Sequence, residues 1–293
     1  MTFRKIYRLL LFSIVALLYN GCQKVISIDT GEIKPRLVLN ALIEPDSTFK
    51  IELSQSRSLM DSLQSIALIT SSTVKVYEDG VLKKTLGYGK EGVYNASFKP
   101  KQTSTYRITV DNTEFGHIEA TTNIPDQPTL VSAVPTTELT PGSSPRFYKY
   151  KLVIRDSGLH RDYYYIRAFL IQRGYAPGNT AGNITAYNIY SDDRVVLNDD
   201  YSLKGVLFDD GAFNGYDYEL IVYSPYKVSF ANPLWFELSS ISKEYYNYLS
   251  SVITQNNAGD NPFAEPVIIK SNVLNGTGVF GARNSVYLKA STN

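Results

Sequence analysis

Residues 36–53, RLVLNALIEPDSTFKIEL, decide the fold class because apolar and polar side chains alternate along them with a period of two. The alternating apolar positions on the two sides of the Pro45-Asp46 turn are Leu37, Leu39, Ala41, Ile43, Phe49, Ile51 and Leu53. Such a pattern places the apolar side chains on one face of an extended chain. The segment therefore predicts two strands, each with one buried face.

The same pattern continues through the next 70 or so residues. Val74, Val76 and Tyr77 lead into Asp79-Gly80, a dipeptide that fits the positive φ angles of a tight hairpin turn. Alternating segments follow around residues 94–98, 106–110 and 118–124. Roughly six or seven short strands in about 90 residues predict a small, immunoglobulin-like β-sandwich over residues 36–126.

A domain boundary is predicted at residues 124–128, where Pro125 and Pro128 end the alternation. Extended segments resume after it and predict a C-terminal β-rich domain over residues 127–293. Its expected strands cover residues 148–154, 163–171, 203–208, 216–223, 226–230, 267–269 and 286–288. The predicted fold class is therefore mainly β, with two β-sandwich-like domains.

One helix is expected near residues 242–255. Ser242 is a good N-cap residue, and Glu244 in the first turn suits the helix dipole. Ile241 and Tyr246 have the spacing of a hydrophobic staple. Apolar residues then recur at helical spacing up to about Gln255, after which Asn256-Asn257-Ala258-Gly259 favours a helix end.

The first 21 residues have the pattern of a signal peptide. Arg4, Lys5 and Arg8 precede an apolar run from Leu9 to Leu18. That run is about half of the roughly 20 residues that a membrane-spanning helix needs. Residues 1–21 are therefore predicted to be removed, leaving a mature chain that crosses no membrane as a helix.

Cys22 follows Gly21 directly and is the only cysteine of the chain. A small residue before a lone cysteine fits cleavage by a lipoprotein signal peptidase between Gly21 and Cys22, with lipid attached to Cys22. Residues 22–35 would then form a lipidated tether. Tyr19 stands where such sites usually have Leu, and the alternative is a plain secreted protein whose cysteine lies near the cleavage point by chance.

Composition narrows the choice of partners. Removing residues 1–21 takes away three of 29 basic residues and none of 28 acidic ones, which leaves a net charge near −2. Nucleic acid is therefore not expected as a partner. A single cysteine allows no internal disulfide, so stability must come from core burial.

Few residues suggest catalysis or metal binding. Ser157, His160 and Asp162 could be imagined as a hydrolytic set, but a polar turn explains them better, and no catalytic residue or cofactor is assigned. An acidic cluster includes Asp199-Asp200, Asp209-Asp210 and Asp217, and it could offer oxygen ligands to Ca²⁺. It lacks the spacing of a calcium loop, so no metal site is assigned; Asp209, Asp210 and Asn214 are the ligands to test first.

Tyrosine is abundant, with 23 residues. A stacking platform for a glycan, or an aromatic surface for a protein partner, could include Tyr163, Tyr164, Tyr165, Tyr216, Tyr218, Tyr223 and Tyr226. Because alternation sends successive residues of a strand to opposite faces, some of these tyrosines are expected in the core instead.

Several motifs occur together in one order. They are the segments 22–26 (CQKVI), 37–43 (LVLNALI), 74–80 (VKVYEDG), 242–249 (SKEYYNYL), 261–266 (NPFAEP) and 276–282 (GTGVFGA). In this order they resemble the Bacteroidota lipoproteins grouped as domain of unknown function 4249 (DUF4249). The resemblance covers essentially the whole mature chain. The first domain, residues 36–126, also resembles the transthyretin-like modules found as extensions on TonB-dependent transporters.

The resemblance implies an outer-membrane lipoprotein of a family without an established activity, whose relatives often accompany TonB-dependent transporters. The resulting hypothesis is a non-enzymatic, lipid-anchored envelope protein that serves such a β-barrel transporter as an accessory. The alternatives are a stand-alone glycan-binding or adhesive surface lipoprotein and, less favoured, a hydrolase. Surface-exported lipoproteins of this phylum usually carry acidic residues soon after the lipidated cysteine, whereas the first acid here is Asp29. This departure weakens a surface assignment, and the face of the outer membrane, periplasmic or surface, is left open.

Overall fold

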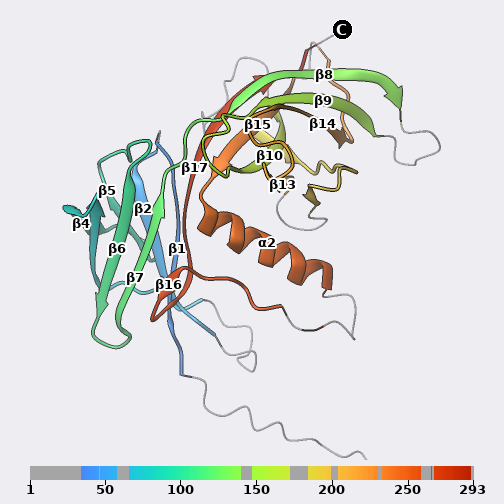
Figure 1. Cartoon of the computed structure of the whole chain (residues 1–293). Coiled ribbons are helices and arrows are strands. Elements are labelled where there is room, and N and C mark those ends of the chain that lie inside the picture. The colour runs from blue at the N-terminus through green and yellow to red at the C-terminus, as the bar shows by residue number, and fades with distance from the viewer. Residues whose placement is uncertain are drawn as a thin grey trace, which may run out of the picture. The chain divides into compact units, whose positions relative to one another are not determined.

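The structure is a computed structural model that describes residues 34–45, 47–57, 66–139, 147–171, 184–198, 204–229, 233–258, 265 and 267–291. Residues Pro35–Asn293 form one compact unit, shown in Figure 1. The predicted signal peptide, its cleavage site and Cys22 lie outside the described residues. The described part of the chain is mainly β with one helix, which confirms the predicted class.

The first half of the unit contains seven strands. They are β1 (Leu37–Ile43), β2 (Phe49–Gln55), β3 (Thr73–Glu78), β4 (Val81–Tyr88), β5 (Val93–Ala96), β6 (Thr105–Asn112) and β7 (Gly116–Asn123). Strand β1 buries every second side chain, as its alternation predicts. The Asp79-Gly80 hairpin is also confirmed, because both residues have positive φ and join β3 to β4.

These strands form two layers around one core. Strand β2 pairs with β1 and β5, whereas β6 pairs with β3 and β7. Strand β4 pairs with both β5 and β3 and so connects the two layers. Leu39 and Ile51 of one layer lie in the same buried cluster as Ile108 of the other. This arrangement is sandwich-like, as expected for residues 36–126.

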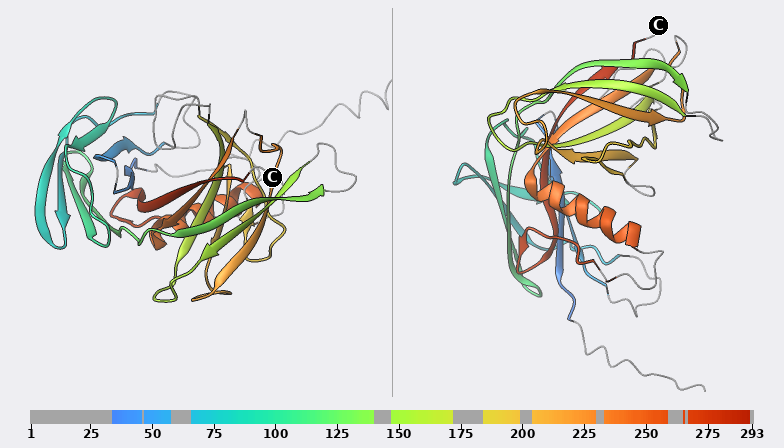
Figure 2. Two further views of the ribbon diagram at one scale, coloured as in Figure 1. Left: turned by 90° about the horizontal axis from the view of Figure 1, so that it is seen from above. Right: turned by 45° about the vertical axis from the view of Figure 1, so that its right-hand side comes forward.

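The last strands of the chain enter that first core. Strand β17 (Thr277–Lys289) runs parallel to β1, and β16 (Val273–Leu274) pairs with β7. In Figure 2 the dark red ribbon of β17 lies beside the blue ribbon of β1. Phe280 and Ala282 of β17 lie in the core of the first half. The predicted strand at residues 286–288 is thus the end of a much longer one, and the backbone of β17 continues from the first core to the second.

The second core lies between further strands. They are β8 (Thr129–Leu139), β9 (Tyr148–Arg155), β10 (Tyr163–Ile171), β11 (Ile184–Tyr187), β12 (Leu197–Asn198), β13 (Gly205–Asp209), β14 (Asp217–Ser224) and β15 (Leu234–Ile241). Strands β14, β9 and β8 form a separate sheet, and β10 pairs with β13 and β15. Tyr150 of β9 packs against Phe236 of β15 with ring centroids 5.4 Å apart.

Two predicted strands are wrong. Residues 226–229 form no strand, and Phe230 lies outside the described residues. Residues 267–269 also form no strand. This segment lies against the helix instead of a sheet edge, since the Lys270 N–H donates to Ser251 Oγ at 3.0 Å.

The helix α2 (Lys243–Ala258) begins where the cap predicts. The backbone carbonyl of Ser242 accepts the Tyr246 N–H at 2.9 Å, and its hydroxyl lies 3.4 Å from the Tyr245 nitrogen. Ile241 and Leu249 share a small buried cluster, against which Tyr246 packs. The helix ends three residues beyond the predicted Gln255. Among the described residues, no helix is long and apolar enough to cross a membrane.

Candidate functional site: an acidic cluster where two turns meet

The candidate site lies where two strand-to-strand turns meet. Residues 156–162 connect β9 to β10, and residues 210–216 connect β13 to β14. Gly158 and Gly215 both have positive φ, and a Cβ on Gly158 would lie only 2.7 Å from the Gly215 Cα. Glycine at these two positions therefore permits the close approach of the turns.

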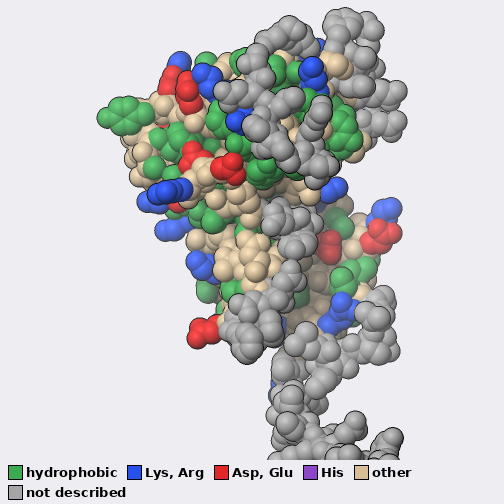
Figure 3. All heavy atoms as spheres, turned by 90° about the vertical axis from the view of Figure 1, so that its right-hand side faces the viewer, with side chains coloured by type: hydrophobic (Ala, Val, Ile, Leu, Met, Phe, Trp, Pro, Cys, Tyr) green, Lys and Arg blue, Asp and Glu red, His purple; other side chains and the backbone are tan. Residues whose placement is uncertain are grey.

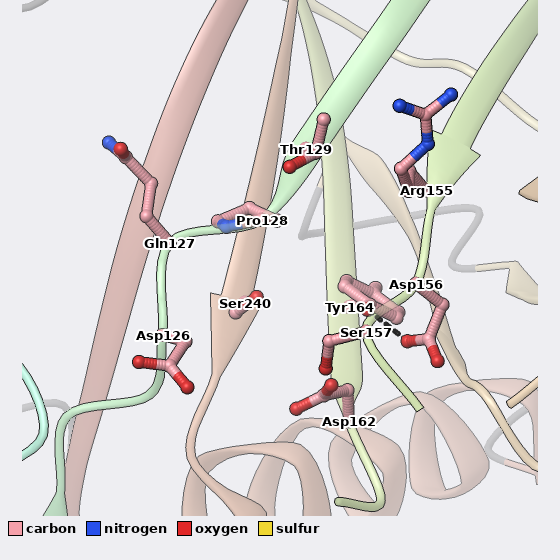
Figure 4. Close-up of a pocket in the computed structure, with 10 residues that line it drawn as sticks. All are labelled: Asp126, Gln127, Pro128, Thr129, Arg155, Asp156, Ser157, Asp162, Tyr164 and Ser240. Atoms are coloured by element: carbon pink, nitrogen blue, oxygen red, sulfur yellow. Dashed lines mark hydrogen bonds between the residues drawn. The ribbon is translucent and has the colours of Figure 1, made fainter. Parts of the chain in front are cut away.

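Asp156 ties the two turns together from inside. Its side chain is 6% exposed. Oδ1 accepts the Tyr164 hydroxyl at 2.6 Å, the bond drawn in Figure 4. Oδ2 accepts two backbone N–H groups, from Gly158 at 3.0 Å and from Gly215 at 2.6 Å. One carboxylate thus holds both turns and strand β10.

Asp162 and Asp210 join the ends of β10 and β13. The Asp162 N–H donates to Asp210 Oδ2 at 2.9 Å, and the Asp210 N–H donates to the Asp162 carbonyl at 3.1 Å. Asp210 is fully buried, and its Oδ1 has no hydrogen-bond partner among the residues that the structure describes. Carboxylate oxygens of Asp156, Asp162 and Asp210 lie within 4.8 Å of one another. We call these three residues the aspartate trio.

Burial and neighbouring carboxyl groups disfavour ionisation of Asp162 and Asp210. Burial, followed by the charges of Asp156 and Asp210, raises the pKa of Asp162 to about 6, although the nearby His160 acts in the opposite direction. Burial also raises the pKa of Asp210. The site therefore concentrates carboxyl groups that lack an ion pair among the described residues, since Arg155 and Arg161 pair with Asp217 and Asp209 instead.

Two hollows open beside Asp162. The first has a volume of about 240 Å³ and is lined by Asp126, Gln127, Pro128, Thr129, Arg155, Asp156, Ser157, Asp162, Tyr164 and Ser240. The second is about 480 Å³, and its lining includes His160, Arg161 and Lys243. Asp126 and Asp162 line both, and Figure 4 shows Asp126 across the first pocket from Asp162. Solvent-sized ligands can therefore reach Asp162 from either side.

The imagined hydrolytic set is not connected as a triad. Ser157 and Asp162 line the first pocket, and His160 lies in the second. Among the described residues, no hydrogen bond links the side chains of Ser157, His160 and Asp162. The Ser157 hydroxyl instead accepts the Leu159 N–H at 3.5 Å, as in a polar turn.

The acidic cluster expected from the sequence is brought together only in part. Asp209 forms an ion pair with Arg161 at 2.8 Å, and Asp217 forms one with Arg155 at 2.9 Å. Asp199 and Asp200 lie outside the described residues. Only Asp210 joins the trio. The sequence prediction of an acidic cluster did not include Asp156 and Asp162, which stand at the two ends of the 156–162 turn. Only the pairing of β10 with β13 shows that they lie close to Asp210.

The tyrosines divide between core and surface, as alternation predicts. Tyr164 and Tyr165 are buried, and Tyr218 stacks on Phe213 with ring centroids 4.1 Å apart. Tyr223 is also buried and stacks on Tyr190. Tyr216, in contrast, is 74% exposed. The predicted tyrosines therefore do not form one continuous exposed platform.

In the described part of the chain, fold and site together define a mainly β protein with one helix and three clustered carboxyl groups where two turns meet, beside a pocket that Asp156 and Asp162 help to line. The chain belongs to the family described as Domain of unknown function (DUF4249), whose family model matches residues 23–287. This match confirms the family suggested by the sequence motifs.

No curated protein matches the sequence. Two solved structures are distantly similar: a DUF4785 family protein from Legionella pneumophila and a putative membrane anchored protein from Corynebacterium diphtheriae. Both share 9% identity with the chain at a TM-score of 0.22. The alignments cover 70% and 71% of this chain, and 51% and 54% of those proteins. The chain thus spans about half the length of each.

Proposed function

We propose that this chain is a non-enzymatic, lipid-anchored protein of the cell envelope that serves an outer-membrane transport system of the TonB-dependent type as an accessory. The observation that carries the proposal is Cys22, a lone cysteine directly after Gly21 and an apolar leader. The folded unit begins at Pro35, 13 residues further along the chain. A short lipidated tether followed by a binding module fits this spacing.

A contact surface for the transporter partner is available beside the aspartate trio. Leu159 and Tyr216 are each 74% exposed. They lie on the two turns that approach each other closely at Gly158 and Gly215. On the face shown in Figure 3, small groups of hydrophobic side chains lie among charged ones. We propose that the Leu159 and Tyr216 side chains become buried against the partner, since aromatic residues are favoured in the cores of protein interfaces.

Co-purification tests this proposal. The full chain, tagged at its C-terminus, is solubilised from outer membranes in mild detergent, and co-purifying proteins are identified by mass spectrometry. We expect a β-barrel transporter to be enriched with the wild type and to be reduced at least about tenfold with the double variant Leu159→Ser, Tyr216→Ser, a loss equivalent to about 1.4 kcal/mol of binding free energy.

The matched control is Ile268→Ser, because Ile268 is 87% exposed but lies outside the two turns. This variant should retain the transporter. If no β-barrel protein is enriched with the wild type, the accessory role is wrong. If both variants retain the partner equally, the accessory role stands but the contact surface lies elsewhere.

A further inference from the structure

Asp210 has a buried oxygen that the protein does not satisfy. Its side chain is fully buried, and Oδ1 has no hydrogen-bond partner within the described part of the chain. Buried polar atoms are nearly always paired, because an unpaired one loses its hydration without compensation. The carboxylate that carries this oxygen lies beside two more carboxylates. A ligand that satisfies the oxygen should therefore be positively charged.

The spacing of the trio fits a single shared ion. Calcium binds oxygen ligands at about 2.3–2.6 Å, so two oxygens on one calcium ion lie at most roughly 5 Å apart. The carboxylate oxygens of Asp156, Asp162 and Asp210 lie within 4.8 Å of one another. One ion can therefore contact all three carboxylates with little movement of the protein.

Each carboxylate also retains capacity for a metal ligand bond. Asp210 offers the unpartnered Oδ1. Asp156 Oδ1 accepts only the Tyr164 hydroxyl, which leaves it a second lone pair. No hydrogen bond of the described residues occupies the Asp162 carboxylate, which lines both pockets. Three anionic oxygens are hard ligands of the kind that calcium prefers.

We propose that the aspartate trio binds Ca²⁺, with water from the pocket completing its coordination. The first pocket, at about 240 Å³, has room for several waters, each of which occupies roughly 30 Å³ in the liquid. Asp126 lies across this pocket from Asp162 and adds a further carboxyl group to its lining. Bound calcium would relieve the repulsion among the trio and fix the 156–162 turn against the 210–216 turn. The proposal is independent of the transporter partner.

Two measurements on the full chain, purified in mild detergent and stripped with a chelator, test the site. The first is thermal unfolding followed by tyrosine and tryptophan fluorescence, with and without CaCl₂. At a calcium concentration about a hundredfold above Kd, we expect the wild-type midpoint to rise by roughly 5 °C. The second is Tb³⁺ luminescence sensitised by Tyr164, which bonds to Asp156; we expect emission that Ca²⁺ removes.

Asp162→Asn and Asp210→Asn should abolish both responses, since each removes one anionic ligand. Asp217→Asn is the matched control, because Asp217 lies at the start of β14 nearby but is paired with Arg155 outside the trio. This variant should respond as the wild type does. If Asp210→Asn does not fold, the result with Asp162→Asn decides. Asp162 is partly exposed, and its carboxylate accepts no hydrogen bond from the described residues, so this variant should fold.

An unchanged wild-type midpoint without Tb³⁺ emission would overturn the proposal, as would an undiminished calcium response in Asp162→Asn. A midpoint that responds to MgCl₂ but not to CaCl₂ would overturn the assignment of calcium. Loss of the transporter partner in the co-purification experiment, in contrast, would leave these results unaffected.

Discussion

Glu237 is a buried acidic residue in the middle of β15. Its replacement by Gln tests how the sheet is stabilised. Its side chain is fully buried. Arg167 of β10, directly opposite, donates through Nε to Oε2 at 2.7 Å, and the Tyr287 hydroxyl of β17 donates to Oε1 at 2.9 Å. Glu237 therefore links the strands on both of its sides.

The expected loss of stability depends on the arginine charges that remain in the Glu237→Gln variant. Arg283, 3.7 Å from Glu237, keeps its ion pair with Glu44, whereas Arg167 loses the only carboxylate described beside it. Removing one partner of a buried ion pair costs about 3–5 kcal/mol when the remaining charge stays desolvated, and the lower end applies here because the Arg167 side chain is 24% exposed. Glu237→Gln should therefore lower the free energy of unfolding by about that amount.

Urea unfolding followed by fluorescence of Trp235, the only tryptophan, measures this loss. With a urea slope of about 3 kcal/mol per molar, the midpoint should fall by about 1 M. The control is Glu219→Gln, because Glu219 pairs with Lys151 at 3.1 Å on the exposed surface. Its effect should be below about 1 kcal/mol. Equal effects of the two variants would refute the reasoning.

Three further variants test other parts of the fold. Glu78→Gln should destabilise the protein at pH 7, because a hydrogen bond from Lys83 outweighs the cost of burial and lowers the pKa of Glu78 below its ordinary 4.5. The ionised form stabilises the fold above pH 4.5, so the stability difference from wild type should shrink as the pH falls through the lowered pKa. A constant difference in urea titrations from pH 7 to 3 would contradict this. Gly278→Ala should cost at least about 2 kcal/mol, because Gly278 has φ +105° and an added Cβ would clash with the Leu39 carbonyl oxygen. Gly87→Ala, with nothing within 4 Å of the added Cβ, should have little effect on the thermal midpoint. Ser242→Ala should cost about 1–2 kcal/mol in urea unfolding through loss of the helix cap and of the Ala282 N–H bond; no loss would show that the cap is dispensable.

Local patterns in the sequence predict the elements whose causes are local. The period-two alternation of residues 37–43 predicts both the strand and its buried face. Ser242 likewise predicts the start of α2, because capping depends on the next few residues alone. The helix end is less well predicted, since Asn256 and Asn257 have low helix propensity and yet continue the last turn.

Features that depend on distant residues are not visible in these patterns. Val38 pairs with Thr277 in a parallel ladder, and no local signal indicates which strand will be the neighbour of β1. Glu237 has the spacing of a surface residue, but strands on both sides and Arg167 allow its burial. The aspartate trio is a similar case. Asp210 was a candidate ligand from the sequence, whereas Asp156 and Asp162 meet it only through the pairing of β10 with β13.

Metabolic labelling with an alkyne fatty acid tests the central claim, lipid anchoring at Cys22, most directly. Cells of the native host that express the tagged wild type or Cys22→Ser are labelled and fractionated, and the tagged protein is coupled to a fluorescent azide. We expect the wild type to carry the label in the outer-membrane fraction, and Cys22→Ser to carry none and to appear as an unprocessed precursor or in the soluble fraction. Outer-membrane anchoring of a mature, unlabelled Cys22→Ser protein would contradict the account.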